Sequence, residues 1–347
     1  MHRWLFASFA LGSLALAQTT HTVQPGETLY RIARQYNTTV EALQVLNQIS
    51  DPTQLRVGQV LRVSGRPDTL LNRLTQAPAP IEALEWPRQT VQGHLAVIRI
   101  TAPQAVQGEV RFLNNAYPIQ QNRVLLPVPA LLAPGVYPAR LRVGNTANPS
   151  SRETADAELH QKEVRLEVRV VAGSFGRFVL QLPPDRQALL VPERLRAERQ
   201  RVVGSCDFSR PQQWRGPFQK PVQTNRITDP FGTRRSYDQG RTYTYHEGID
   251  YGAPEGTPVY APTPGIVGLA EQLFVRGGAV TLDHGLGVCS GYWHLSRIVV
   301  RPGQAVQAGD LLGYSGNTGL SSGPHLHFEI RVRGIPTNPA PWFLSVP

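Results

Sequence analysis

Apolar and polar positions near the start of the chain predict a small module with two helices, spanning residues 20–64. The first helix, with Thr28 as its N-cap, is indicated by apolar residues on one face, at i, i+3, i+4 and i+7. These residues are Leu29, Ile32, Ala33 and Tyr36. The second helix begins at a capping-box pattern, residues 38–41. Its expected buried positions are Val40, Leu43 and Leu46. Short strands at 21–23 and 58–63 flank the helices, which gives a β-α-α-β order.

Farther along the chain, helical spacing gives way to strict alternation, which is typical of strands with one buried face. In residues 164–170, Val or Leu alternates with Arg or Glu, and turn signals such as residues 133–135 separate such runs. Repeated alternating strands between residues 85 and 172 predict a β-sandwich-like domain, of which the immunoglobulin-like arrangement is one form. Nothing in this domain resembles a site, so we interpret it as a spacer or a partner surface.

Segments rich in proline or charge divide the chain into further units. Residues 65–84 are predicted to be a linker, because prolines interrupt regular structure there. Residues 173–215 are predicted to be a connector, whose dense Arg/Glu run at 192–201 is typical of a solvated helix face. In residues 216–347, glycine and proline turns alternate with short strands, which predicts a mainly antiparallel β domain.

Residues 1–17 are predicted to be a secretory signal peptide. A basic start is followed by an apolar stretch that ends in ALA at residues 15–17 and is shorter than the ~20 residues of a membrane span. No later segment is apolar enough to cross a bilayer, so we expect a secreted or periplasmic mature protein. An exported chain permits a disulfide between Cys206 and Cys289, but a buried Cys289 and a free Cys206 thiol fit the sequence equally well.

The formal net charge of the chain is +10, and its basic residues are nearly all arginine. A positive field of this kind favours polyanionic partners such as nucleic acid, anionic lipid or an acidic cell wall. The sequence has no helix-turn-helix pattern, no zinc-finger spacing and no basic run with interleaved aromatic residues. We therefore exclude nucleic acid and expect an anionic cell envelope as the partner.

Two segments of the last domain carry candidate metal ligands: HEGID, from His246 to Asp250, and HLH, from His325 to His327. The second segment reads as a strand, on which side chains two residues apart point to the same face. Catalytic zinc takes three protein ligands and keeps one position open for water. His246, Asp250 and one histidine of the second segment meet this requirement, and the spacing alone does not decide which one.

Two further histidines of this domain have different expected roles. His294, in the segment GYWHL, is a candidate for proton transfer or for stabilising charge on a reacting carbonyl group. His284, in the segment DHG, stands where a predicted strand ends in a turn, so we interpret it as structural.

Residues 20–64 resemble a LysM domain. The resemblance is carried by VQPGETL at 23–29, IA at 32–33, Asn47 and VGQVL at 57–61, at the spacing usual for the family. LysM domains bind chains of N-acetylglucosamine-containing glycan, so the resemblance implies that a sugar groove is flanked by residues 26–29 and 47–55. The implied glycan-contacting residues are Gly26, Thr28, Leu29, Asn47 and Leu55.

The last domain resembles the lysostaphin-type zinc endopeptidases, which hydrolyse peptide bonds in the stems or cross-bridges of peptidoglycan. The matching segments are DPFGTR at 229–234, HxGxD at 246–250, GTPVYA at 256–261, GIV at 265–267, YxHL at 292–295, Gly309, GNTG at 316–319 and GPHLHFE at 323–329. Carried over by position, the resemblance implies that His246, Asp250 and His327 bind zinc and that His294 and His325 are catalytic. The segment GVC at 287–289 departs from the family. By strand parity, Cys289 should face away from the metal unless a bulge intervenes.

Together these features predict a zinc-dependent hydrolase of peptide bonds in peptidoglycan, which its LysM module holds on the wall. Tethering of this kind raises the local concentration of substrate. The alternative is a non-catalytic peptidoglycan-binding envelope protein that activates or regulates a partner hydrolase. A third reading is an active zinc domain that the connector or the middle domain keeps latent. The presence of every matching ligand favours the enzyme over the non-catalytic alternative.

Overall fold

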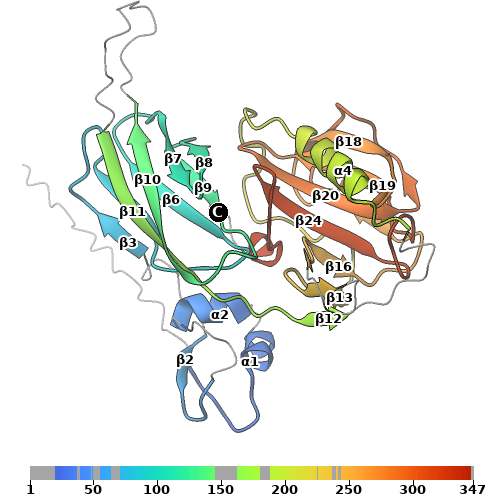
Figure 1. The fold of residues 1–347 in the computed structure, drawn as a ribbon, viewed down its shortest axis with the longest axis horizontal. Helices are drawn as coiled ribbons and strands as arrows, with labels where there is room; N and C mark the ends of the chain where they lie inside the picture. The colour runs from blue at the N-terminus through green and yellow to red at the C-terminus, as the bar shows by residue number, and fades with distance from the viewer. Residues whose placement is uncertain are drawn as a thin grey trace, which may run out of the picture.

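The structure is a computed structural model that describes residues 20–36, 40–47, 49, 55–63, 71–144, 162–179, 188–224, 226–236, 240 and 244–344. It has three units: a small helical one, a β-sandwich and a C-terminal β domain covered by one helix (Figure 1). The predicted signal peptide lies outside the described residues. No helix in the described part of the chain combines the length and the apolar character that a membrane span requires.

The N-terminal unit has one antiparallel pair of strands, β1 (Thr20–Thr22) and β2 (Val60–Arg62). The helices α1 (Leu29–Gln35) and α2 (Val40–Asn47) lie between them in the chain, in the β-α-α-β order that the sequence pattern predicts. Apolar residues of both helices, of β2 and of the positions that directly follow β1 and β2 form a small core: Val23, Leu29, Ile32, Ala33, Leu43, Leu61 and Val63. Thr38 and the side chain of Leu46 lie outside the described part, so the capping box stays a prediction.

The middle unit is built from two sheets. Its strands are β3 Leu71–Leu74, β4 Ala83–Pro87, β5 Thr90–Val91, β6 Leu95–Thr101, β7 Gly108–Phe112, β8 Asn115–Pro118, β9 Arg123–Pro127, β10 Gly135–Val143 and β11 Lys162–Val171. One sheet has the order β3-β4-β6-β9 and the other β5-β11-β10-β7-β8. Alternate residues of both sheets, such as Ile98 and Leu166, fill one common core. The expected all-β character is therefore found. Strand β3 lies inside the segment predicted to be a linker, and the immunoglobulin-like arrangement stays a prediction.

The C-terminal unit is built on an eight-stranded sheet. Its strands are β13 Ile227–Asp229, β16 Ile249–Tyr251, β18 Gly265–Leu273, β19 Gly277–Asp283, β20 Val288–Leu295, β22 Ala305–Val306, β24 Leu326–Val332 and β25 Ile335–Thr337. The order is β13-β16-β24-β20-β19-β18-β22, and β25 pairs with β24. Apolar residues of one face, such as Tyr292 and Phe328, pack in the core of the domain. The opposite face is therefore the one that carries the polar residues of β24.

Two smaller sheets and a short 3-10 helix complete this unit. One sheet joins β12 Arg177–Val179, β14 Arg234–Ser236 and β15 Thr244–Tyr245, and the other joins β17 Pro258–Tyr260, β23 Leu311–Tyr314 and β21 Arg297–Ile298. The 3-10 helix η2 spans Ala340–Phe343. Strand β12 belongs to the predicted connector, so part of the connector is built into this unit.

Helix α4 (Pro192–Gly204) covers part of the polar face of the sheet. The Arg/Glu run predicted a solvated helix face, and most of its residues are indeed exposed, but Glu198 and Val202 are buried. Val202 packs with apolar residues of the sheet, which are Leu269, Leu273, Ala279 and Trp293. A disulfide between Cys206 and Cys289 joins the end of α4 to β20, which resolves the alternative that the sequence left open.

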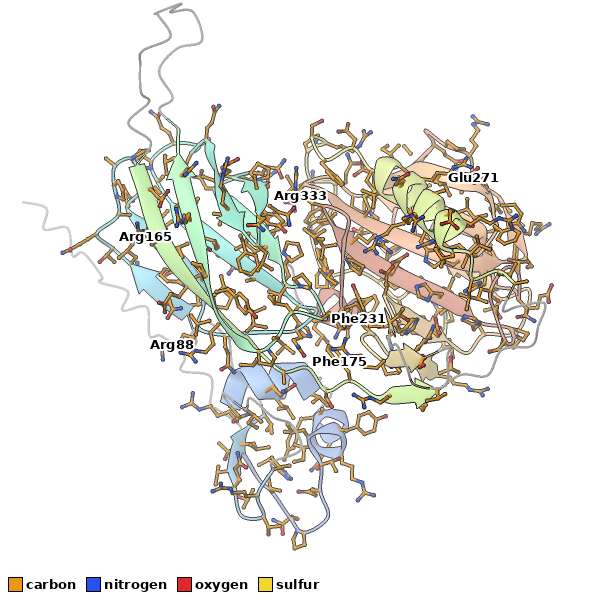
Figure 2. All side chains as sticks on the ribbon, viewed as in Figure 1. Arg88, Arg165, Phe175, Phe231, Glu271 and Arg333 are labelled. Atoms are coloured by element: carbon orange, nitrogen blue, oxygen red, sulfur yellow. A yellow bond between two sulfur atoms is a disulfide. The ribbon has the colours of Figure 1, made fainter. Side chains whose placement is uncertain are left out.

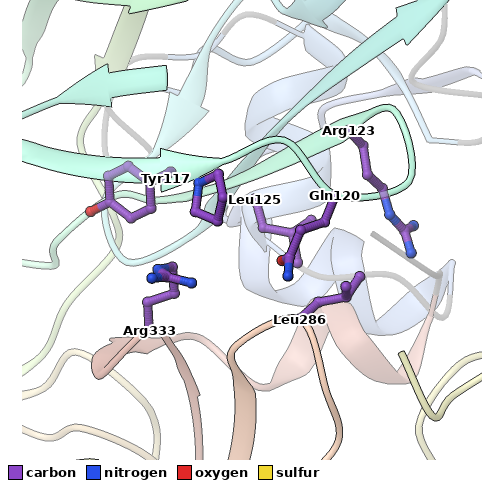
Figure 3. Close-up of a pocket in the computed structure, with 7 residues that line it drawn as sticks. Tyr117, Gln120, Arg123, Leu125, Leu286 and Arg333 are labelled. Atoms are coloured by element: carbon purple, nitrogen blue, oxygen red, sulfur yellow. The ribbon is translucent and has the colours of Figure 1, made fainter. Parts of the chain in front are cut away.

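The sandwich packs directly on the C-terminal unit. Val97, Leu125 and Ala130 of the sandwich belong to the same buried cluster as Trp214 and Trp342. A small pocket lies at this junction (Figure 3), lined by Tyr117, Pro118, Gln120, Arg123, Leu125, Leu286 and Arg333. Its volume of about 10 Å³ is about that of a single water site. The pocket is therefore a seam between packed units and not a ligand site.

Candidate metal centre

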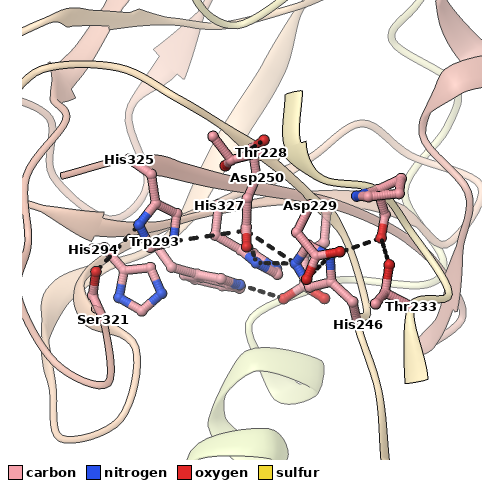
Figure 4. Close-up of polar contacts among 12 residues, drawn as sticks. Thr228, Asp229, Thr233, His246, Asp250, Trp293, His294, Ser321, His325 and His327 are labelled. Atoms are coloured by element: carbon pink, nitrogen blue, oxygen red, sulfur yellow. Dashed lines mark hydrogen bonds and ion pairs between the residues drawn. The ribbon is translucent and has the colours of Figure 1, made fainter. Parts of the chain in front are cut away.

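Three candidate metal ligands converge, two from neighbouring strands of the large sheet and one from the segment that leads into it (Figure 4). Asp250 on β16 and His327 on β24 are directly paired in the antiparallel register. His246 lies four residues before Asp250, between β15 and β16. Its Nε2 atom is 3.0 Å from Asp250 Oδ1 and 2.9 Å from His327 Nδ1, and the last two atoms are 2.8 Å apart. The structure thus brings together the three residues that the resemblance selected.

This triangle of donor atoms fits a metal ion. Two imidazole nitrogens and one carboxylate oxygen face each other, and a single proton can bridge only one pair of them. Burial by itself would raise the pKa of Asp250, but the adjacent His246 and His327 hold it well below its usual range. Burial also lowers the pKa of His327. A charged carboxylate and a neutral imidazole are the forms that bind zinc, and His₂-carboxylate is a ligand set of catalytic zinc.

The glycine between the first two ligands has a steric function. A Cβ atom at Gly248 would lie 2.3 Å from the carbonyl oxygen of Phe328 and 2.7 Å from Nε2 of His327. Only a residue without a side chain lets this segment approach β24 closely enough to complete the triangle. This explains in physical terms why the segment reads HxGxD.

Two of the ligands are held by further hydrogen bonds. Nδ1–H of His246 donates to the carbonyl oxygen of Pro230 at 3.0 Å, which leaves Nε2 free for the metal. The guanidinium group of Arg235 donates to Asp250 Oδ2 at 2.8 Å and also to Asp229 Oδ2 at 2.8 Å. Sequence reasoning missed Arg235. The signal available for it was the position directly after the DPFGTR segment.

His294 and His325 lie beside the triangle and present the same ring nitrogen to it. Nδ1–H of His294 donates to the carbonyl oxygen of Thr318, and Nδ1–H of His325 donates to that of Gly323, each at 2.8 Å. The Nε2 atoms are therefore the proton-accepting ones, and that of His325 is 3.7 Å from Asp250 Oδ1. Burial, together with the neighbouring histidines, lowers the pKa of His294 to about 3. His294 is therefore neutral in the metal-free protein near pH 7.

A β-bulge places His294 in the site. Between Val280↔Tyr292 and Gly278↔Leu295, β20 has one more residue than β19, and His294 takes a left-handed backbone conformation with φ of 66°. The bulge breaks the alternation along β20. The strand-parity expectation for Cys289 held only for a strand without a bulge, so it does not apply to β20. The register places Cys289 on the face of His327, because it pairs with Arg331, four residues farther along β24. At that position it reaches α4 and not the metal.

A network of buried charged residues connects the segment that carries the candidate ligands to α4. The indole Nε1–H of Trp293 donates to Glu329 Oε1 at 2.6 Å, and Glu329 pairs with Arg331 at 2.7 Å. Arg331 also pairs with Glu247, whose other carboxylate oxygen is 3.5 Å from Arg199 of α4. Glu247, which directly follows the ligand position His246, is thus tied to both β24 and α4. Sequence analysis did not single out this network.

The candidate glycan-contacting residues have structural functions in the N-terminal unit. Gly26 has φ of 78° in its turn, and Thr28 Oγ1 accepts a hydrogen bond from the backbone N–H of Arg31 at 3.3 Å, as an N-cap does. The side chain of Leu29 lies in the core, and Leu55 packs against that core. The side-chain amide of Asn47 bonds to the backbone of Leu43 and Arg62. Sugar contacts of these residues stay a prediction.

His284 is structural in the described fold. It is completely buried, its Nδ1–H donates to the carbonyl oxygen of Pro264, and Nε2 bonds to the hydroxyl of Ser290, both at 2.8 Å. Burial lowers its pKa from 6.5 to about 4. Because the folded protein resists this protonation, the unfolded chain binds the proton first as the pH falls below 6.5. Stability that is fully present above pH 6.5 is therefore lost between pH 6.5 and 4.

We expect this residue alone to make the free energy of unfolding about 3 kcal/mol smaller at pH 4 than at pH 7, because its two pKa values differ by about 2.5. In His284→Gln, this part of the pH dependence should vanish, although the protein is less stable at pH 7. Urea unfolding at pH 7, 5.5 and 4, with chelator present, measures the free energy of unfolding of each variant. His94→Gln is the control. Equal pH dependence in His284→Gln and the parent would contradict the prediction.

Residues 244–339 match the model of peptidase family M23, and residues 21–64 match that of the LysM domain. The two resemblances stated from the sequence are therefore confirmed. The family match and the His-Asp-His donor set both indicate zinc as the cofactor.

Relatives with assigned names match the same region. The chain is 41% identical over 128 residues to the DD-carboxypeptidase/endopeptidase Mpg of Neisseria meningitidis serogroup B, which covers 37% of this chain and 29% of that protein. It is 42% identical over 123 residues to the peptidoglycan DD-endopeptidase ShyA of Vibrio cholerae, covering 35% and 29%. The chain thus spans less than a third of the length of these curated relatives.

One solved structure agrees with the overall fold. A peptidase M23 from Pseudomonas aeruginosa aligns with a TM-score of 0.53 at 24% sequence identity, covering 74% of this chain and 96% of that chain. At this level of identity the comparison shows the fold alone. It extends well beyond the region of the family match, so the likeness includes more than the peptidase domain.

Proposed function

We propose that this protein is a zinc-dependent endopeptidase that hydrolyses peptide bonds in peptidoglycan stems or cross-links. The observation that carries the proposal is the donor triangle of His246, Asp250 and His327 with two more histidines beside it, each presenting Nε2. A structural zinc site is closed by four protein ligands. This site has three ligands and two adjacent proton acceptors, which is the composition that hydrolysis requires.

Zinc bound to the triangle would polarise the substrate carbonyl and acidify an attacking water. The other functions belong to the chain itself. His325 and His294 carry their Nδ1 protons toward backbone carbonyls, so Nε2 of one of them accepts the proton of the attacking water. Its imidazolium then lies beside the oxyanion and stabilises it. When the C–N bond breaks, the same Nε2–H delivers its proton to the leaving amine, which balances the hydrolysis.

The substrate class is inferred from the two ends of the chain together. The N-terminal unit matches the LysM domain, and two relatives of the C-terminal unit bear names that specify peptidoglycan or DD-endopeptidase activity. We propose that the glycan lies against the backbone of residues 26–29 and the stretch 47–55. The side chain of Leu29 is buried in the core and that of Asn47 already bonds to the backbone, so neither is available for the sugar. The LysM module then concentrates the peptidase on wall peptides. A secreted or periplasmic location and an anionic envelope partner complete the proposal.

The proposal is tested with purified sacculi carrying a covalent dye. The mature protein should release dye, chelation should stop the release, and added zinc should restore it. His325→Ala should bind the sacculi as the parent does but release little dye. Binding without release by the zinc-loaded parent would identify the non-catalytic envelope protein instead. Release that begins only when residues 173–347 are tested without the rest, so that β12, α4 and Cys206 are kept, would identify latency.

A further inference from the structure

One turn of the chain fixes the position of His246. The carbonyl oxygen of Pro230 accepts its Nδ1–H at 3.0 Å. The backbone N–H of Gly232 donates to the carbonyl oxygen of His246 at 2.8 Å, and the N–H of His246 donates to that of Thr233 at 2.9 Å. Three hydrogen bonds therefore tie this ligand to residues 230–233, and a movement of the turn would move the ligand with it.

The connector packs on this turn through Phe175. A Cβ atom at Gly232 would lie 2.1 Å from Cε1 of Phe175, so the ring rests directly on the Gly232 backbone. The ring also meets the edge of Phe231, with centroids 6.3 Å apart, and the guanidinium group of Arg234 lies 5.3 Å from its centroid. Figure 2 shows Phe175 and Phe231 together between the sandwich and the C-terminal unit.

The sandwich holds the same turn from another side. Phe231 is 4% exposed, and a Cβ atom at Gly93 of the sandwich would lie 2.2 Å from Cε1 of its ring. Asn338 of the C-terminal unit donates its backbone N–H to the carbonyl oxygen of Gly93 at 2.7 Å. The turn is therefore packed between the sandwich and the connector, two parts of the chain that lie outside residues 244–339 of the family match.

The connector continues along the strand that supports a second ligand. Strand β12 pairs in parallel with β14, so that Phe178 stands opposite Arg235. The guanidinium group of Arg235 donates to Asp250 Oδ2 at 2.8 Å. Phe178 itself is 54% exposed, whereas Phe175 is packed against the core. The two phenylalanines, three residues apart, thus differ in whether they touch the turn that carries the ligand.

We propose that Phe175 is a positioning residue of the metal centre, which acts on His246 through the turn at residues 230–233. The connector and the sandwich are then part of the support of the zinc site. Contacts that orient a metal ligand typically change metal affinity by about 10–100-fold when they are lost. The effect should appear in zinc affinity itself, whether or not the enzyme turns over substrate.

The test uses the full mature chain and its zinc dissociation constant, measured by competition with a chromophoric chelator at pH 7.5. Phe175→Ala should bind zinc about 10-fold more weakly than the parent. Phe178→Ala is the matched control, with the same atoms removed from the same connector three residues farther along, and should bind as the parent does. Phe175→Leu keeps an apolar side chain on Gly232 and should recover most of the affinity.

A second measurement separates positioning from general destabilisation. Urea unfolding of the metal-free variants identifies conditions in which each one is fully folded, and zinc affinity is compared only there. Parental affinity in folded Phe175→Ala, or an equal loss in Phe178→Ala, overturns the proposal. If Phe175→Ala does not fold, Phe175→Leu and Phe175→Val replace it. Affinity must then fall in the order Phe, Leu, Val, and equal affinities of the three overturn the proposal.

Discussion

Replacement of His327 by alanine is expected to abolish both stoichiometric zinc binding and peptidoglycan hydrolysis. His327 Nδ1 is 2.8 Å from Asp250 Oδ1 and 2.9 Å from His246 Nε2, so its loss removes one of three converging donors. Because His327 is one of the three proposed ligands, the loss of zinc affinity should exceed the ~10–100-fold that follows removal of a residue that only supports a ligand. Zinc content after gel filtration and dye release from sacculi measure the two effects.

The matched control for this variant is His94→Gln. His94 lies in the sandwich, where its Nε2 is 3.2 Å from the amide nitrogen of Asn338, and glutamine can keep that contact. This control should retain one zinc per chain and parental activity. A His327→Ala protein that still binds one zinc per chain and hydrolyses peptidoglycan at the parental rate would show that the triangle is not the metal site.

Alanine at His294 or at His325 is expected to separate chemistry from metal binding. Each ring is held by a backbone carbonyl at Nδ1 and leaves Nε2 as a proton acceptor beside the triangle. Removal of a positioned general acid–base group costs roughly 10²–10⁴-fold in rate. We expect a fall of that size in kcat with one zinc per chain retained. The rate of dye release from sacculi and the zinc content, measured on the same preparation, check both parts of the prediction.

The two variants also differ in a way that the structure explains. His294 sits on a bulge with φ of 66° and packs against His325, with ring centroids 4.7 Å apart, so His294→Ala also relaxes its neighbour. His325→Asn is the milder probe, because an amide can keep the contact with Gly323. If either alanine variant loses its zinc completely, that histidine is a ligand and not a proton acceptor, and the proposed division of functions is wrong.

The sequence could predict the parts of this protein that local patterns define. Helix spacing around Leu29 and Ile32 indicated α1, and the alternation at residues 164–170 indicated a strand of the sandwich. The same parity rule placed His325 and His327 on one face, but it could not choose between them. The choice depends on the direct pairing of Asp250 with His327, which is a property of the sheet register and not of either segment.

Features that depend on contacts between distant segments could not be predicted. The bulge at His294 shifts the alternation along β20, so Cys289 lies on the face of His327. No local sequence signal indicates this bulge. From the sequence alone, Arg235 cannot be distinguished from the other arginines. Only the fold brings it to Asp229 and Asp250. Phe175 lies in a connector without regular periodicity. The function that we propose for it depends on the contact of its ring with the Gly232 backbone, which only the fold reveals.

Zinc-dependent cleavage of a peptide bond can be observed by mass spectrometry of the fragments that the mature protein releases from defined peptidoglycan, with zinc and with chelator. We expect muropeptide fragments with new amino and carboxyl termini at a peptide bond, no new reducing sugar ends, and no fragments with chelator. Fragments cut in the glycan, or the same peptide fragments in chelated and verified zinc-free protein, would contradict a zinc-dependent endopeptidase built on His246, Asp250 and His327.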